Sequence, residues 1–255
     1  MLPLTSSCLS RSSKALVKAS VSDKFNLNQK GFSFVKNLLT TTPYHIVATS
    51  RSRATFEESC KLANFDATLK SRITFLPLDV TSELSIQAAA KNVSEKFGQK
   101  SLRCLINSAG YLLPEKSIRN VDFKQAEHHF QVNTIGPMLM AKHFSGLLAN
   151  PEKSPSLASG PLTKSVWVNI SARTGSIGDN HLGGWYSYRM SKAALNQLTK
   201  TLAIELGRKG TLVVSLHPGT VVGLTHIRLP SRILIFQENI RKTWRRTRNC
   251  PQTRP

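Results

Sequence analysis

The alternation of short apolar runs with longer helical patterns is the feature of this sequence that most constrains its fold. Apolar runs predict strands at residues 45–49, 73–78, 103–106, 166–171 and 212–216. Apolar residues at helical spacing predict helices at residues 31–39, 55–63, 83–97, 122–148 and 188–208, the fourth with a kink at Gly136 and Pro137. Strands and helices that alternate in this way form a parallel sheet with helices on both faces. We therefore predict an α/β fold with a doubly wound parallel sheet.

Polar and glycine-containing segments follow the carboxyl ends of four predicted strands. In doubly wound sheets, ligands bind beyond these ends of the strands. We therefore predict a binding cleft at this edge of the sheet. The segments that would meet there are Asp79, residues 107–110, Ser171, and Pro218 with Gly219.

Tyr188 and Lys192 lie one turn apart at the start of the last predicted helix, on the same face as Leu195 and Leu202. An ammonium group beside a phenol, with little water around them, lowers the pKa of the phenol and prepares it to exchange a proton. The alternative is a tyrosine that packs in the core while the lysine stem carries its charge to solvent. The pair alone leaves both interpretations open.

The cysteines and the apolar runs exclude several classes of protein. Cys8, Cys60, Cys104 and Cys250 are far apart and form no cluster with histidine, which argues against a disulfide framework and against a metal site. No apolar run approaches the roughly 20 residues that span a membrane. We therefore expect a soluble protein in a reducing compartment, with no membrane partner.

The basic charge is concentrated at the two ends of the chain. The formal net charge is +21, of which residues 1–30 carry +4 and residues 228–255 carry +7. Such charge attracts polyanions without sequence preference, and no nucleic-acid motif accompanies it, so we expect no specific nucleic-acid partner. Residues 1–22 are rich in serine and contain no acid, as in organelle transit peptides; the alternative is a disordered N-terminus. We expect a cytoplasmic protein, or a plastid or mitochondrial one if these residues are a transit peptide.

A set of short motifs, in order along the chain, resembles the classical short-chain dehydrogenases/reductases. Tyr188 and Lys192 have the family's Y-x-x-x-K spacing, and the other motifs follow the expected strands or lie in the expected helix. Residues 175–185 are similar to the branch of carbonyl reductases and C-factor-like proteins, and the whole resemblance covers residues 31–221. The other motifs are Asp79-Val80-Thr81, Asn107-Ser108-Ala109-Gly110, Asn133, Asn169-Ile170-Ser171 and Pro218-Gly219.

The resemblance implies a Rossmann-like domain that exchanges a hydride between a nicotinamide cofactor and a carbonyl or an alcohol. Tyr188 would be the general acid/base, and Lys192 would lower its pKa and hold the nicotinamide ribose. Asn133 would support a proton-relay water, and Ser171 is the candidate for the catalytic hydroxyl. The residues that the resemblance places along the cofactor are Asp79, Val80, Asn107, Ala109, Gly110, Pro218, Gly219 and Val221.

Arg51 favours NADP(H) over NAD(H). Dinucleotide sites that prefer NAD(H) place a carboxylate after the second strand, where it binds the ribose hydroxyls. Here that segment reads Ser50-Arg51-Ser52-Arg53 and contains no acid. A guanidinium group matches a 2′-phosphate because its paired N–H groups form bidentate, charge-assisted hydrogen bonds.

The sequence departs from the family at three places. Residues 24–30 contain no glycine, although the family has a glycine-rich phosphate loop before its first helix, so cofactor binding is in doubt. Residues 15–17 are at most a remnant of the first strand, and a sheet without that strand would be incomplete. Ala172 occupies the position of the family's catalytic serine, and Ser171 can replace it only where the strand has ended or bulged. From Val222 onward the sequence is basic and lacks the family pattern.

These departures predict a basic N-terminal segment at residues 1–30, a Rossmann-like domain at 31–221 and a basic, disordered tail at 222–255. We predict an NADP(H)-dependent oxidoreductase that acts on a small-molecule carbonyl or alcohol and could form a homo-oligomer. The first alternative is a catalytically inactive relative, or a splice or gene-model fragment, that acts by protein association. A second alternative, a polyanion binder, rests on the basic tail alone.

Overall fold

A parallel sheet forms the centre of the fold. The structure is a computed structural model that describes residues 14–18, 28–149 and 164–218. Six strands lie side by side in the order β3-β2-β1-β4-β5-β6, all parallel, which confirms the predicted doubly wound sheet. Their bounds are β1 Lys14–Lys18, β2 His45–Ser50, β3 Ile73–Pro77, β4 Leu102–Asn107, β5 Ser165–Ile170 and β6 Thr211–Leu216.

Strand β1 fills the middle of the sheet, inside the segment that was predicted to precede the domain. It pairs with β2 from Lys14 opposite His45, and on its other side with β4 from Lys14 opposite Leu102, with a register shift before Ala15. The backbone groups of β2 and β4 that would lack partners without this strand are therefore paired. Strand β1 and the start of α1 at Asn28 thus lie before residue 31, where the domain was predicted to begin. Residues 19–27, where a phosphate loop would lie, are outside the described residues.

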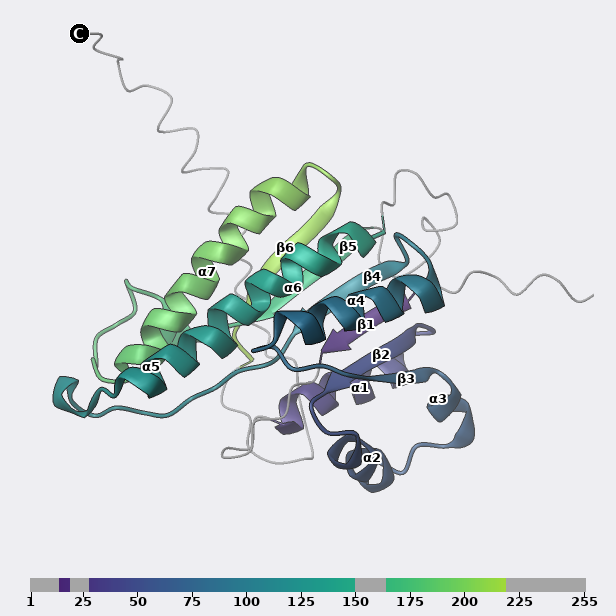
Figure 1. Ribbon diagram of the computed structural model, residues 1–255, viewed down its shortest axis with the longest axis horizontal. Coiled ribbons are helices and arrows are strands. Elements are labelled where there is room, and N and C mark those ends of the chain that lie inside the picture. The colour runs from purple at the N-terminus through teal and green to yellow at the C-terminus, as the bar shows by residue number, and fades with distance from the viewer. Residues whose placement is uncertain (1–13, 19–27, 150–163, 219–255) are drawn as a thin grey trace, which may run out of the picture.

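Helices cover the sheet on both faces (Figure 1). Helices α4 (Glu83–Phe97), α6 (Gly136–Phe144) and α7 (Tyr186–Gly207) pack on one face, over buried Leu105 and Trp167. Helix α1 (Asn28–Thr41) packs on the other face, over Ile46. The shorter helices α2 (Arg53–Leu62) and α3 (Ala67–Ser71) connect β2 to β3. Side chains accept hydrogen bonds from first-turn N–H groups and thereby begin α2, α3, α4 and α5 (Phe123–Phe130): Ser52, Asp66, Ser82 and Asp122.

The second face of the sheet is only partly covered. The helices that contribute to its core within the described residues are α1, α2 and α3. Val166 of β5 and Val214 and Leu216 of β6 are only partly buried against this core. Among the described residues, this face is therefore incompletely covered beside β5 and β6.

The predicted long helix at residues 122–148 is interrupted one turn before the expected kink. Helix α5 is followed by a π-helical turn at Gln131–Ile135, and only then does α6 begin, at Gly136. Pro137 has no N–H group, so the carbonyl of Asn133 has no donor four residues further along. The widened bond itself runs from the N–H of Gly136 to the carbonyl of Gln131, five residues earlier, and π-helical turns of this kind are frequent at functional sites.

Candidate active site

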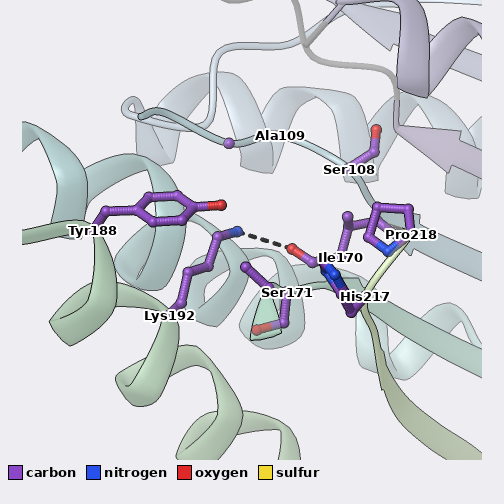
Figure 2. Close-up of a pocket in the computed structure, with 10 residues that line it drawn as sticks. Ser108, Ala109, Ile170, Ser171, Tyr188, Lys192, His217 and Pro218 are labelled. Atoms are coloured by element: carbon purple, nitrogen blue, oxygen red, sulfur yellow. Dashed lines mark hydrogen bonds between the residues drawn. The ribbon is translucent and has the colours of Figure 1, made fainter. Parts of the chain in front are cut away.

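Lys192 and Tyr188 lie in the first two turns of α7 and face the carboxyl end of β5 (Figure 2). The Lys192 side chain is buried, with 3% of its surface exposed, as its place on the apolar stripe predicts. Its Nζ donates a hydrogen bond to the carbonyl oxygen of Ile170 at 2.9 Å and lies 5.8 Å from the centroid of the Tyr188 ring. The ammonium group is thus fixed between the end of β5 and the tyrosine.

The direction of the pKa shift at Tyr188 corrects the sequence expectation. Burial raises the pKa of Tyr188 from 10.0 to about 12, whereas the lysine was expected to lower it. Removing a phenolate from water disfavours its charge, and Lys192 directs its ammonium group at the Ile170 carbonyl, so its attraction does not offset this loss. The phenol is therefore protonated at neutral pH and is able to donate a proton.

Asn133 is fully buried in the π-helical turn beside this pair. Its side-chain oxygen accepts from the backbone N–H of Tyr111 at 2.8 Å, and its Nδ2 donates to the Tyr111 carbonyl and to Ser191 Oγ, each at 2.9 Å. Thr134 Oγ1 donates to the Ser191 carbonyl at 2.9 Å. These bonds hold the π-helical turn against α7, so Asn133 acts through its amide as a support for the site.

Ser171 lines the cleft, but its hydroxyl group is directed elsewhere. Strand β5 ends at Ile170, which meets the condition that the sequence sets for Ser171 to replace the serine absent at Ala172. Its Oγ nevertheless donates to Asn196 Oδ1 at 2.8 Å, and Figure 2 shows this oxygen turned away from Tyr188. Ser171 would need another rotamer to contact a substrate oxygen bound at Tyr188.

A cleft with a cavity of about 70 Å³ opens where β4, β5 and β6 end. It brings together Tyr188 and Lys192 with residues from the turns after all three strands. His217, which belongs to none of the predicted motifs, lines it because it directly follows β6. The lining residues are Ser108, Ala109, Gly110, Ile170, Ser171, Ala172, Tyr188, Lys192, His217 and Pro218. Two residues predicted for this site, Gly219 and Val221, lie outside the described residues.

The residues predicted for the far end of a cofactor follow β2 and β3, away from this cleft. Arg51 is exposed directly after β2. Asp79 uses Oδ1 to accept from the N–H and the hydroxyl of Thr81, at 2.9 and 2.8 Å, as in an ordinary turn. Val80 is buried, and a Cβ atom on Gly136 would lie 2.9 Å from its Cβ.

Asn107 has a structural role inside the sheet. Its side chain is buried, and its Nδ2 donates to Asn169 Oδ1 at 2.8 Å. Asn169 in turn donates to Thr199 Oγ1 of α7 at 2.9 Å. The predicted residue at position 107 thus connects β4, β5 and α7, whereas its successors Ser108, Ala109 and Gly110 line the cleft.

Two further classes of site are not found in the described part of the chain. No group of three or more His, Cys, Asp and Glu side chains there could hold a metal ion. In the same residues, no helix is long and apolar enough to cross a membrane.

Comparison with known proteins shows that the chain is similar to oxidoreductases. A family model described as enoyl-(acyl carrier protein) reductase matches residues 37–245, and so continues past Val221, where the sequence resemblance was expected to end. The chain is 34% identical over 144 residues to 1-hydroxy-2-glutathionyl-2-methyl-3-butene dehydrogenase of Rhodococcus, covering 56% of this chain and 57% of that protein. It is 35% identical over 117 residues to C-signal of Myxococcus xanthus, covering 46% and 64%. The chain thus spans less than two thirds of the length of these relatives.

Two solved structures have a similar backbone. The NADPH-bound carbonyl reductase from chicken fatty liver has a TM-score of 0.66 and 31% identity, with 84% of each chain covered. Carbonyl reductase Sniffer of D. melanogaster has a TM-score of 0.67 and 27% identity, with 82% of this chain and 81% of that chain covered.

Proposed function

Because this chain belongs to the short-chain dehydrogenase/reductase family, we propose that it reduces a small-molecule carbonyl, or oxidises the corresponding alcohol, with NADP(H) as the hydride carrier. The observation that carries the proposal is the pair of half-buried Tyr188 and buried Lys192 at the carboxyl end of β5, inside the cleft. A tyrosine that packed only in the core would not direct its hydroxyl into a cleft beside a buried ammonium group. The likeness to the NADPH-bound carbonyl reductase from chicken fatty liver supports both the reaction class and the cofactor.

The polar groups around the cleft fit a nicotinamide cofactor. Lys192 Nζ reaches the cleft, and Gly110 presents no side chain there: a Cβ atom at this position would lie 3.8 Å from that nitrogen. Arg51 would bind a 2′-phosphate beyond β2, and Asp79 would bind the adenine end through the carboxylate oxygen that Thr81 leaves available. When bound, the nicotinamide supplies or accepts the hydride.

In the reducing direction, Tyr188 donates its phenolic proton to the substrate oxygen. The pKa of about 12 keeps this proton on the phenol at neutral pH, so Tyr188 is in the protonated form that a general acid requires. Lys192 stabilises the phenolate that forms, because its ammonium group is already fixed beside the ring. The carbonyl of Asn133, which has lost its helical donor to Pro137, is suited to accept a hydrogen bond from a water that returns the proton.

The test is NADPH oxidation with a panel of aldehydes and ketones, comparing the wild type with Tyr188→Phe. We expect turnover in the wild type and a loss of about 100-fold or more in the variant, since general acid catalysis contributes on that order. Lys200→Ala, on the same helix and half-buried, is the matched control and should keep full turnover. Turnover that is equal in Tyr188→Phe and the wild type would refute the mechanism.

A catalytically inactive relative that acts by protein association is the second candidate. It is supported by the Ser171 hydroxyl, which is bound to Asn196, and by the absence of glycine from residues 24–30. A thermal-shift titration with NADPH separates the two candidates, because a ligand that binds the folded state raises its unfolding temperature. A rise with NADPH supports the oxidoreductase, whereas no rise at millimolar NADPH supports the inactive relative.

A further inference from the structure

The first turn of α7, which carries Tyr188, has no N-terminal cap of its own. Trp185 precedes the helix in a left-handed conformation, with φ of 55°, and offers no side-chain hydrogen bond. The first N–H groups of a helix have no partner within the helix and need acceptors from elsewhere. The acceptor for Ser187 comes from a segment 72 residues earlier in the chain.

Glu115 supplies that acceptor from inside the protein. Only 6% of its surface is exposed, and its Oε2 accepts from the backbone N–H of Ser187 at 3.2 Å. Its Oε1 accepts a short hydrogen bond from Ser187 Oγ, and its backbone carbonyl accepts from the N–H of Trp185 at 2.7 Å. A carboxylate at this end of a helix is also favoured by the helix dipole.

The segment that carries Glu115 is itself fixed to the site at every second residue. Asn133 binds both backbone groups of Tyr111, and His129 Nε2 accepts from the N–H of Leu113 at 3.1 Å. His129 and Asn133 are fully buried. Residues 111–115 therefore form a rigid strap between the cleft turn at 108–110 and the start of α7.

We propose that Glu115 is a positioning residue for Tyr188: its carboxylate fixes the first turn of α7 and thereby the place of the Tyr188 hydroxyl in the cleft. Tyr188 directly follows Ser187, and its hydroxyl lies at the far end of a long side chain. A small rotation of the turn therefore moves the hydroxyl by a larger distance. The effect on turnover rests on the proposed function, whereas the effect on the helix turn does not.

The experiment compares Glu115→Ala, Glu115→Gln and Ser187→Ala in the full chain. Glutamine retains an acceptor oxygen for the Ser187 N–H, and its amide can donate to Ser187 Oγ, so this variant should rescue the geometry that alanine loses. Asp66→Ala is the matched control: it removes the carboxylate that caps α3, which accepts from Leu69 N at 2.7 Å, far from the cleft.

The first readout is amide hydrogen exchange at residues 186–189, which does not depend on activity. We expect faster exchange there in Glu115→Ala, wild-type exchange in Glu115→Gln and Asp66→Ala, and an intermediate rate in Ser187→Ala. The second readout is turnover: kcat should fall about 10- to 100-fold in Glu115→Ala, because a displacement on the order of 1 Å costs that much, while the KM for NADPH stays unchanged.

The outcomes distinguish this inference from the proposed function. Unchanged exchange at residues 186–189 in Glu115→Ala overturns the inference, and so does faster exchange with an unchanged kcat. An equal loss of kcat in Asp66→Ala also overturns it, because any loss of stability would then suffice. If the wild type reduces no carbonyl, the proposed function fails, and the exchange pattern alone decides whether Glu115 fixes the turn. If Glu115→Ala does not fold, Ser187→Ala against Glu115→Gln gives the same comparison.

Discussion

Gly175 is the position where one added methyl group should affect both the stability and the site. It lies in the 3-10 turn Arg173–Gly175 that follows Ala172, and it is buried against α7. A Cβ atom built there would lie 2.8 Å from the backbone carbon of Lys192 and 2.9 Å from Lys192 Cβ. Ordinary contacts begin at 3.4 Å, so α7 or the turn must move by about half an ångström. Because the atoms are backbone or next to it, a side-chain rotation cannot relieve the clash.

We expect Gly175→Ala to destabilise the fold by about 1–3 kcal/mol, the usual cost of overpacking a well-packed site. In a protein of this size, each kcal/mol lowers Tm by roughly 2–4 °C. The displacement should also shift Lys192 Nζ from the Ile170 carbonyl. The fall in kcat should therefore be larger than the fall in the amount of folded protein accounts for. Differential scanning calorimetry and NADPH oxidation measure the two effects.

The matched control is Gly207→Ala at the end of the same helix, where a Cβ atom meets nothing within 4 Å. This variant should be as stable as the wild type or slightly more stable, since alanine favours helix over glycine. A Gly175→Ala variant with the Tm and kcat of the wild type would refute the close approach between the turn and Lys192.

Three further predictions concern single side chains. Burial lowers the pKa of His129 below its ordinary 6.5, so the stability it contributes is fully present above pH 6.5 and is lost as the pH falls through its lower folded value. The free energy of unfolding, measured with urea, should therefore fall more steeply with decreasing pH in the wild type than in His129→Gln. Free energies of unfolding that fall in parallel with pH in the two proteins would contradict this. Burial raises the pKa of the Cys104 thiol to about 12, so iodoacetamide at mildly alkaline pH should label half-buried Cys60 before Cys104; equal labelling of these two by peptide mass mapping would contradict it. Arg51→Glu should weaken NADPH binding by about 10- to 100-fold and leave NADH binding unchanged. Calorimetric titrations that show an unchanged ratio of the NADPH and NADH dissociation constants would exclude the guanidinium as the phosphate ligand.

The sequence predicts the sheet because periodicity is a local signal. Strands β2 to β6 and helices α1, α2, α4 and α7 lie within a few residues of the predicted ranges, whereas α3 was not predicted. Strand β1 has only five residues, with lysine at both ends, and it is defined by its two neighbours, which local periodicity does not show. The kink was predicted at Gly136 and Pro137, whereas the π-helical turn lies one turn earlier, where Asn133 binds Tyr111 and Ser191 across segments that no local pattern relates.

The sequence predicts which residues line the candidate site better than it predicts the electrostatics of these residues. The Y-x-x-x-K spacing and the turns after the strands identify most of the residues that line the cleft. The pKa of Tyr188 depends on how deeply the ring is buried and on where the Lys192 ammonium group points, and the Y-x-x-x-K spacing indicates neither. The Ser171 rotamer depends on Asn196, and the contact between Glu115 and Ser187 joins segments that no local pattern relates.

The central place of β1 has a consequence for synthesis on the ribosome. The nascent chain can pair β1 with β2 as soon as Ser50 has been made, but the other side of β1 waits for β4, which is complete only at Asn107. Until then β1 is an edge strand, with a row of backbone groups open to other chains. Strand β1 is thus enclosed late, and the nascent protein is prone to aggregate through this edge while residues 51–107 are being made.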